Sequence, residues 1–375
     1  MDYSINNVSF KGYDAIKLKG LYMQGFINEH DLAICRQIKK IAEKEHLDFF
    51  INQNNKGIKR YIEAGLTSDK PLLRVWGQDR KAFLKNGTNY TIMCPRDEIL
   101  IDLPEELSAF EMKQRNILPR GGNYYIGYKP TGEKWMIING EYVTEYREQH
   151  YYPEKICLEN IKDVYGIERE NTCVTDYLCY DLDMLIRPIG YPYVLVNHDE
   201  ETFKNIEKLR TKFPQSNEIY KKLIDFQKHI CLTKKSNKLC DCLKDFGFIP
   251  IKIGGFYSED INFLNSIAFK NGNNRISLIS NSTQHSCPEL EYLEELFEKD
   301  LREKVAGIEN VYFVSGGKKT VETFGKDDWI RTHNFPAYRF NEYHNVIMDW
   351  LGEHHGGIHC MTAEIPDFDK LTNGV

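Results

Sequence analysis

The stretch WLGEHHGGIHC, from Trp350 to Cys360, contains three histidines, a Gly-Gly pair and a final cysteine. Glycine tolerates backbone conformations that other residues avoid, so the pair allows a sharp turn shortly before the thiol. A cysteine beyond such a turn, flanked by His359, is a candidate nucleophile in its thiolate form. The alternative is a buried structural thiol. His354 and His355 are adjacent and cannot both face one site, so the stretch is only a weak zinc candidate.

Four stretches of the chain resemble the guanidine-modifying, or pentein, superfamily. The segment FNEYHNVIMDWLGEHHGGIHCMT resembles the C-terminal part of protein-arginine deiminases, and its end, GGIHCMT, also resembles agmatine deiminases and glycine amidinotransferases. LLRVWGQDRKAFL (72–84) is similar to the family's Trp-x-x-Asp segment, and LPRGGNYYIG to its Gly-Gly-Asn turn. YDLDMLIRPIGYPYVLV (180–196) resembles its His-x-Asp segment. The matches occur in family order and cover nearly the whole chain from about residue 45.

The resemblance implies a role for each matched residue. Cys360 is the nucleophile, and Asp79 and Asp183 are the guanidinium ligands. The substrate-binding set also includes Trp76, Gly122 and Asn123. A guanidinium is planar, charged and rich in N–H donors, so two carboxylates can hold it through paired hydrogen bonds. The thiolate then adds to the central carbon, ammonia leaves, and water hydrolyses the covalent thiouronium. The implied reaction converts arginine, free or within a peptide or protein, to citrulline.

One position departs from the family pattern. Asp181 stands where the family has its acid/base histidine. A carboxylate can shuttle protons if a neighbouring acid or desolvation favours its protonated form, and Asp183 is such a neighbour. His359 is a further candidate for the proton transfer. Two alternatives therefore stay open. One is an amidinotransferase or a small-molecule guanidine deiminase, and the other is a catalytically silent binding or effector module.

Charge and composition restrict the partners. The 375 residues carry a net charge of -6, which argues against non-specific nucleic-acid binding and mildly favours a cationic substrate. We expect an arginine-containing substrate or a small guanidino compound, no nucleic acid and no membrane. The oligomeric state stays open. We expect no metal and no cofactor. Calcium stays open because some relatives of this superfamily require it, although the acidic residues here are too dispersed to indicate coordination.

Cysteine usage and the N-terminal sequence indicate the compartment. The ten cysteines are not regularly spaced in the sequence, which favours free thiols in a reducing environment. Cys240 and Cys242, in LCDC, are too isolated for a zinc site. The N-terminal residues show no signal peptide. We therefore expect a cytoplasmic protein, and a secreted effector without a visible signal peptide stays open.

Hydrophobic periodicity predicts the elements that position these residues. Residues 28–47 predict an amphipathic helix with Ile34, Ile38 and Ile41 on one face, capped by Asn28. Residues 288–301 predict a second one. Apolar runs predict strands at 47–51, 135–138, 193–196, 248–253, 275–280 and 311–314. Residues 248–314 then form one strand, turn, strand, helix, strand module. His198, Asp199 and Glu200, which follow the strand at 193–196, are expected to be solvated.

These elements predict an α/β protein without linkers, and therefore a single compact unit. The resemblance implies more. It implies a pentein-type α/β propeller of five ββαβ-like modules around a central site. Residues 46–375 are then a single pentein-like catalytic domain, and residues 1–45 are an N-terminal segment and helix of the same unit.

Overall fold

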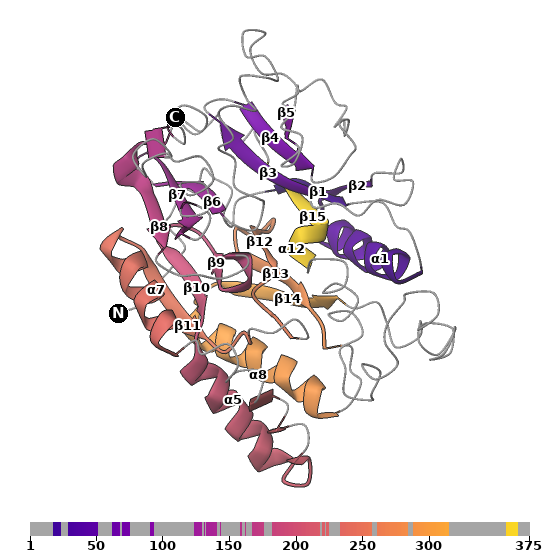
Figure 1. Cartoon of the computed structure of the whole chain (residues 1–375). Helices are drawn as coiled ribbons and strands as arrows, with labels where there is room; N and C mark the ends of the chain where they lie inside the picture. Colours follow the sequence, from indigo (N-terminus) through magenta and orange to yellow (C-terminus); the bar gives the residue numbers. More distant parts are fainter. Residues whose placement is uncertain are drawn as a thin grey trace.

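The chain has an α/β fold, as the sequence predicts. The computed structural model describes residues 18–23, 29–51, 62–67, 70–75, 91–93, 124–129, 131, 133–140, 143, 158–159, 162, 167–175, 182–217, 220–221, 223–224, 233–256, 261–283, 288–314 and 358–366. Within these residues, fifteen strands form five three-stranded sheets (Figure 1).

All five sheets share one strand pattern. The middle strand is antiparallel to one neighbour and parallel to the other in every case. An antiparallel pair can be joined by a short turn, whereas a parallel pair requires a longer crossover. In strand order, the sheets are β15 (Thr362–Pro366), β1 (Leu18–Met23), β2 (Asp48–Ile51); β3 (Ile62–Thr67), β4 (Lys70–Val75), β5 (Thr91–Met93); β6 (Tyr124–Tyr128), β7 (Lys134–Asn139), β8 (Thr172–Thr175); β9 (Ile186–Pro188), β10 (Tyr193–Asn197), β11 (Ile249–Ile253); and β12 (Ile267–Lys270), β13 (Ile276–Asn281), β14 (Ile308–Val314).

Among the described residues, helices occupy three of the crossovers between parallel strands. The crossovers contain α1 (Glu29–Lys44) between β1 and β2, α5 (Asp199–Lys212) and α7 (Thr233–Asp245) between β10 and β11, and α8 (Pro288–Lys304) between β13 and β14. Three short helical turns are also described: η2 (Arg169–Asn171), η3 (Leu182–Met184) and α12 (Ile358–Met361). Figure 1 shows α5 and α8 side by side, and these two helices are in contact.

The sheet of β12, β13 and β14 is buried on both faces. Along β12, Ile267 and Phe269 belong to one core cluster with the apolar face of α1, while Ala268 belongs to another with α5 and α8. Successive residues of a strand point to opposite faces, so each face meets a different set of helices. Burying a large aliphatic or aromatic side chain contributes about 1.5 to 3 kcal/mol. This sheet is therefore fixed from two sides.

The predicted helices and strands are found within three residues of their expected bounds. The helix at 28–47 is α1, with Ile34, Ile38 and Ile41 buried, and the helix at 288–301 is α8. All six predicted strands are present. The grouping of residues 248–314 into one module is wrong. β11 pairs in parallel with β10 in another sheet, and the first strand of the module is β12.

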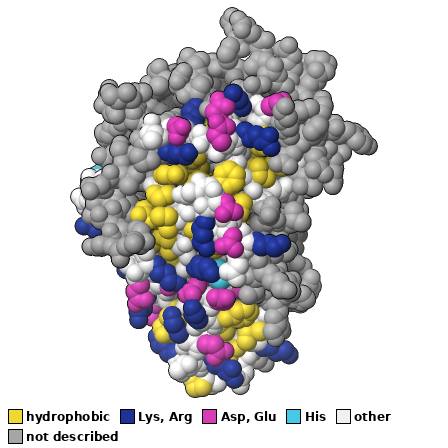
Figure 2. All heavy atoms as spheres, turned by 90° about the vertical axis from the view of Figure 1, so that its left-hand side faces the viewer, with side chains coloured by type: hydrophobic (Ala, Val, Ile, Leu, Met, Phe, Trp, Pro, Cys, Tyr) yellow, Lys and Arg dark blue, Asp and Glu magenta, His cyan; other side chains and the backbone are white. Residues whose placement is uncertain are grey.

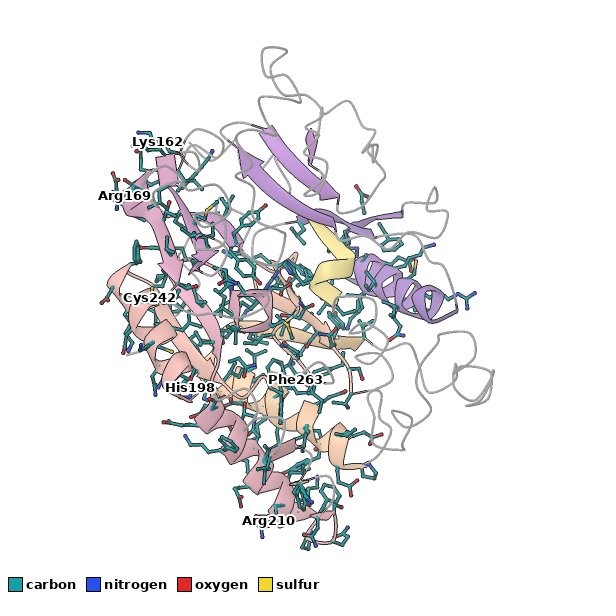
Figure 3. The ribbon with its side chains drawn as sticks, in the orientation of Figure 1. Lys162, Arg169, His198, Arg210, Cys242 and Phe263 are labelled. Atoms are coloured by element: carbon teal, nitrogen blue, oxygen red, sulfur yellow. The ribbon has the colours of Figure 1, made fainter. Side chains whose placement is uncertain are left out.

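The solvated loop expected at residues 198–200 is a second error. His198 and Asp199 are buried, and only Glu200 is exposed. His198 directly precedes α5, where Figure 3 labels it, and its Nε2 lies 3.0 Å from Asn237 Oδ1 of α7. Burial, followed by the nearby Lys252 charge, lowers the pKa of His198 despite the opposing Asn237 contact. α7 covers the residues after β10, and this long-range contact is not visible in the local sequence.

The face that carries α7 and β8 mixes charges of both signs. Figure 2 shows hydrophobic side chains gathered across the middle of this face, with acidic and basic side chains interspersed above and below them. Phe246 and Ile249 are among the exposed large hydrophobic residues. In the described part of the chain, no helix is long and apolar enough to cross a membrane.

Candidate active site

Two of the residues singled out in the sequence meet in the interior. Asp183 Oδ2 lies 2.8 Å from His359 Nδ1, and both side chains are fully buried. Asp183 comes from η3, just before β9, and His359 from α12, just before β15. The pair therefore connects two stretches that lie 176 residues apart in the sequence. His359 immediately precedes Cys360, which is also part of α12.

Asn265 joins the carboxylate to the backbone of α12. Its Nδ2 donates to Asp183 Oδ2 at 2.8 Å, and its Oδ1 accepts from the backbone N–H of His359 at 3.1 Å. One amide side chain thus contacts both members of the pair. An ionised carboxylate only accepts hydrogen bonds, so an ionised Asp183 pairs with the His359 tautomer that carries its proton on Nδ1. The contact with the carboxylate then fixes the orientation of the imidazole ring.

A second asparagine holds the start of α12. Asn281, the last residue of β13, accepts from the backbone N–H of Ile358 at 3.0 Å. Its Nδ2 donates to the carbonyl oxygens of Asn262 and Asn265, at 2.7 and 2.9 Å. The first amides of a helix lack partners inside the helix and need acceptors from elsewhere. Asn281 and Asn265 supply two of these acceptors, and they position the short helix that carries Cys360.

Asn262 organises the loop before β12. Its Oδ1 accepts from the backbone amides of Leu264 and Asn265, at 3.0 and 2.9 Å, and its Nδ2 donates to the carbonyl oxygen of Met184 at 3.0 Å. Asparagine commonly forms such turns because its side chain can accept from amides two or three residues ahead. Asn262 therefore shapes the loop that presents Asn265 and ties this loop to η3.

Tyr125 covers the imidazole from another sheet. The rings of Tyr125 and His359 stack with centroids 5.8 Å apart and an interplanar angle of 29°. The Tyr125 hydroxyl donates to the carbonyl oxygen of Ile186 at 3.2 Å. The guanidinium carbon of the buried Arg187 lies 5.4 Å from the same ring centroid. β6 thereby covers the imidazole with an aromatic ring, and β9 places a buried cation near that ring.

The remaining predicted site residues lie outside the description or are described in part. Asp79, Trp76, Gly122, Asn123 and Asp181 lie outside the described residues. Cys360 is described as part of α12, without its side chain. Their roles stay predictions. Among the described residues, no group of three or more His, Cys, Asp or Glu side chains is arranged to hold a metal ion.

Sequence reasoning missed the three asparagines. Asn262, Asn265 and Asn281 carry most of the hydrogen bonds that build this site. A local signal exists, because Asn262 and Asn265 interrupt the apolar stretch INFLNSIAF and Asn281 follows the strand ISLIS. Buried asparagines need hydrogen-bond partners, but the sequence alone does not identify them.

Comparisons with known proteins give two similar solved structures of interest. One is the X-ray structure of a protein named as a candidate agmatine deiminase, with a TM-score of 0.48, 11% identity and coverage of 95% of each chain. The other is the C. jejuni agmatine deiminase, with a TM-score of 0.47, 11% identity and coverage of 97% of this chain and 98% of the other. Neither likeness by itself identifies the reaction of this chain. No protein-family model matches the sequence, and no curated protein does.

Proposed function

We propose that this chain is a cysteine-dependent hydrolase acting on a guanidino group, in the manner of the pentein enzymes that its motifs resemble. The observation that carries the proposal is the 2.8 Å contact between Asp183 and His359. The sequence assigned YDLDM and GGIHCMT separately to one guanidinium site. The contact between the two stretches in the interior is what one shared site requires, and it supports the proposal.

The proposed chemistry uses Cys360 as nucleophile. Its thiolate adds to the guanidinium carbon, and the tetrahedral adduct expels ammonia once a proton reaches the leaving nitrogen. Water then attacks the thiouronium and releases the ureido product and the free thiol. The net reaction consumes one guanidino compound and one water and yields one ureido compound and one ammonia. The proposed substrate is arginine, free or in a peptide, or a small guanidino compound.

Asp183 combines two tasks in this proposal. A carboxylate has about four acceptor positions on its two oxygens, so contacts with His359 and Asn265 through Oδ2 are compatible with a bound guanidinium. Asp79 is the proposed second ligand. Proton transfer falls to Asp181 or to His359, whose ring is oriented by Asp183. Histidine is the side chain that most often serves as general acid or base in enzymes.

The fold we propose for this activity is a closed ring of five modules around a central site, formed by the whole chain as one unit. The shared strand pattern of the five sheets supports this proposal. Support also comes from the pairing of β1 with β15, which joins an early strand to a late one. α12 directly precedes β15, so the proposed nucleophile lies next to the sheet that completes the ring.

The test is product analysis with arginine, agmatine and a blocked arginine peptide. We expect equal amounts of ammonia and ureido product from one of these substrates. Cys360→Ala should abolish both products. Cys240→Ala is the control: it removes a buried thiol, 1% exposed, and the folded variant should retain activity. Ammonia release that survives Cys360→Ala would refute the role of the thiol. Product that forms without ammonia, and only with an added amine, would identify an amidinotransferase.

A silent binding module is the second candidate, favoured by Asp181 in place of the family's histidine. In that case no ureido product forms at any pH, while guanidino ligands still bind. Isothermal titration of agmatine into unmodified and Asp183→Asn protein distinguishes the two cases. Binding that depends on Asp183 in the absence of turnover supports the silent module.

A further inference from the structure

Two cysteines outside the candidate active site lie next to each other. Cys173 belongs to β8 and Cys242 to α7, and their Sγ atoms are 3.8 Å apart although 69 residues separate them. Cys242 Sγ also lies 3.4 Å from the carbonyl oxygen of Val174. Figure 3 marks Cys242 on α7, near β8. The two thiols thus meet where a strand of one sheet contacts a crossover helix of the next sheet.

The two sulfurs differ in their access to solvent. Cys173 is fully buried, whereas Cys242 is partly exposed. A small oxidant in solution therefore reaches Cys242 first, and the buried thiol of Cys173 is already in contact with it. A disulfide has an S–S distance of about 2.05 Å, so the two sulfurs must approach each other by about 1.8 Å. Side-chain rotations of this size occur between ordinary rotamers.

We propose that Cys173 and Cys242 form an oxidisable thiol pair that closes to a disulfide between β8 and α7. The oxidant is a peroxide, with hydrogen peroxide as the simplest case. The Cys242 thiolate takes one oxygen from the peroxide and becomes a sulfenic acid, while hydroxide leaves. The Cys173 sulfur then attacks the Cys242 sulfur and expels a second hydroxide. The sum is two thiols and one peroxide giving one disulfide and two waters, with two electrons transferred.

Cys240 provides an internal comparison on the same helix. It lies two residues from Cys242 and is 1% exposed. Burial raises the pKa of Cys240, although Lys252 and Lys244 oppose the shift. A thiol with a raised pKa forms little of the reactive thiolate at neutral pH. Cys240 is therefore a suitable control for the selectivity of oxidation.

The disulfide would affect the chain segment that connects β8 to η3, the helical turn that carries Asp183. β8 ends at Thr175, and η3, which carries Asp183, begins at Leu182. A bond from Cys173 to α7 would fix the start of this connection. It would also close a covalent loop between positions 69 residues apart, and such a loop restricts the unfolded chain and stabilises the folded one. The effect does not depend on a reaction at Cys360.

The test is peptide mapping without reduction after the reduced full-length protein is exposed to hydrogen peroxide. We expect one linked peptide pair that contains Cys173 and Cys242, has lost two hydrogens, and separates on addition of dithiothreitol. We also expect the melting temperature of the oxidised protein to rise by about 2 to 5 °C. Both changes should occur equally in Cys240→Ser and be absent in Cys242→Ser and Cys173→Ser.

Cys242→Ser is the more informative of these variants, since Cys242 is partly exposed and its replacement disturbs the core less. Oxidation of Cys242 to a sulfinic acid without a link to Cys173 would overturn the proposal. A linkage of Cys242 to Cys240, or no oxidation of Cys242, would overturn it as well. Cys360→Ser separates this proposal from the proposed function, because the linked peptide should form in that variant even if no guanidino substrate is found.

Discussion

Two buried carboxylates, Asp183 and Glu45, are surrounded by different kinds of partner. Glu45, just beyond the end of α1, accepts from the Ser277 hydroxyl at 3.0 Å, the Asn310 side-chain amide at 2.9 Å and the Tyr312 hydroxyl at 2.6 Å. All three donors are neutral and come from β13 and β14. Asp183 accepts from one neutral amide and from the imidazole of His359, next to Cys360.

Burial of a carboxylate does not by itself indicate a catalytic role, as the two sets of hydrogen-bond partners show. A buried carboxylate needs hydrogen bonds whatever its purpose, and Glu45 obtains them from the sheet that α1 covers. Its contacts join one helix to one sheet. Asp183 instead contacts an imidazole, and Asn265 connects it to the backbone of α12. An imidazole beside a candidate nucleophile, rather than burial alone, distinguishes the candidate active site.

Replacement of Asp183 by Asn should have the largest effect and tests the difference directly. The amide keeps the shape of the carboxylate but removes its charge, which holds both the imidazole and, in the proposed function, the guanidinium. We expect kcat/KM for the guanidino substrate to fall on the order of 10²- to 10⁴-fold. Asp241→Asn, which changes a carboxylate whose side chain is 71% exposed, should leave kcat/KM unchanged. If Asp183→Asn lowers only the unfolding free energy, Asp183 is structural in the same sense as Glu45.

Glu45→Ala should show the opposite pattern. It leaves three donors without their acceptor, so we expect the free energy of unfolding to fall by about 2 to 4 kcal/mol, with kcat almost unchanged. The measurement is urea unfolding followed by tryptophan fluorescence. Glu43→Ala is the matched control, because Glu43 is 63% exposed and its contact with Lys39 is a surface pair. A large loss of kcat in folded Glu45→Ala protein would contradict the comparison.

Asn265→Ala sharpens the comparison, because Asn265 serves both the carboxylate and α12. We expect about 1 to 3 kcal/mol lower unfolding free energy, together with a roughly tenfold lower kcat and a smaller change in KM. Asn273→Ala is the control, since Asn273 is exposed and contacts Glu309 at the surface. A loss of stability at constant kcat would make Asn265 a structural residue only.

Tyr312→Phe should have the smallest effect: it removes one of the donors to Glu45 at every pH, and it changes the pH dependence of stability only at alkaline pH. Burial, followed by the hydrogen bond to Glu45, raises the pKa of Tyr312. Above about pH 10 the unfolded chain loses this proton while the folded chain keeps it, so unfolding free energy decreases as pH rises. The measurement is the urea midpoint of unfolding from pH 8 to 11. We expect this midpoint to decrease less steeply with pH in Tyr312→Phe than in the unmodified protein. Parallel curves would show that Tyr312 does not contribute to the alkaline loss.

The local pattern of apolar residues predicted where helices and strands lie better than it predicted which strands pair with each other. α1 and α8 follow from apolar residues at helical spacing, and β7 and β10 from short apolar runs. β12 was missed because IAFK is only four residues long and merges with the apolar stretch before it. β11 was assigned to the wrong module, since its parallel pairing with β10 depends on the packing of α5 and α7 between them.

The candidate site was predictable only as a set of motifs. The sequence placed Asp183 and the end of the chain in one site, yet it did not predict the direct contact of Asp183 with His359 or the bridging by Asn265. Such contacts depend on side chains from elements that are distant in sequence. The prediction that His198 is solvated was wrong for the same reason, because α7, which covers this residue, begins more than thirty residues later.

The pairing of β1 with β15 has a consequence for the order of assembly. Leu21 of β1 lies opposite Glu364 of β15, so β1 must wait for a strand that is synthesised hundreds of residues later. Contacts between residues so far apart are closed late and raise the contact order of the fold. On the ribosome, β1 and α1 emerge long before residues 358–366, which supply both α12 and the strand that β1 needs. Until those residues emerge, the edge of β1 that later pairs with β15 stays open to pairing with other chains.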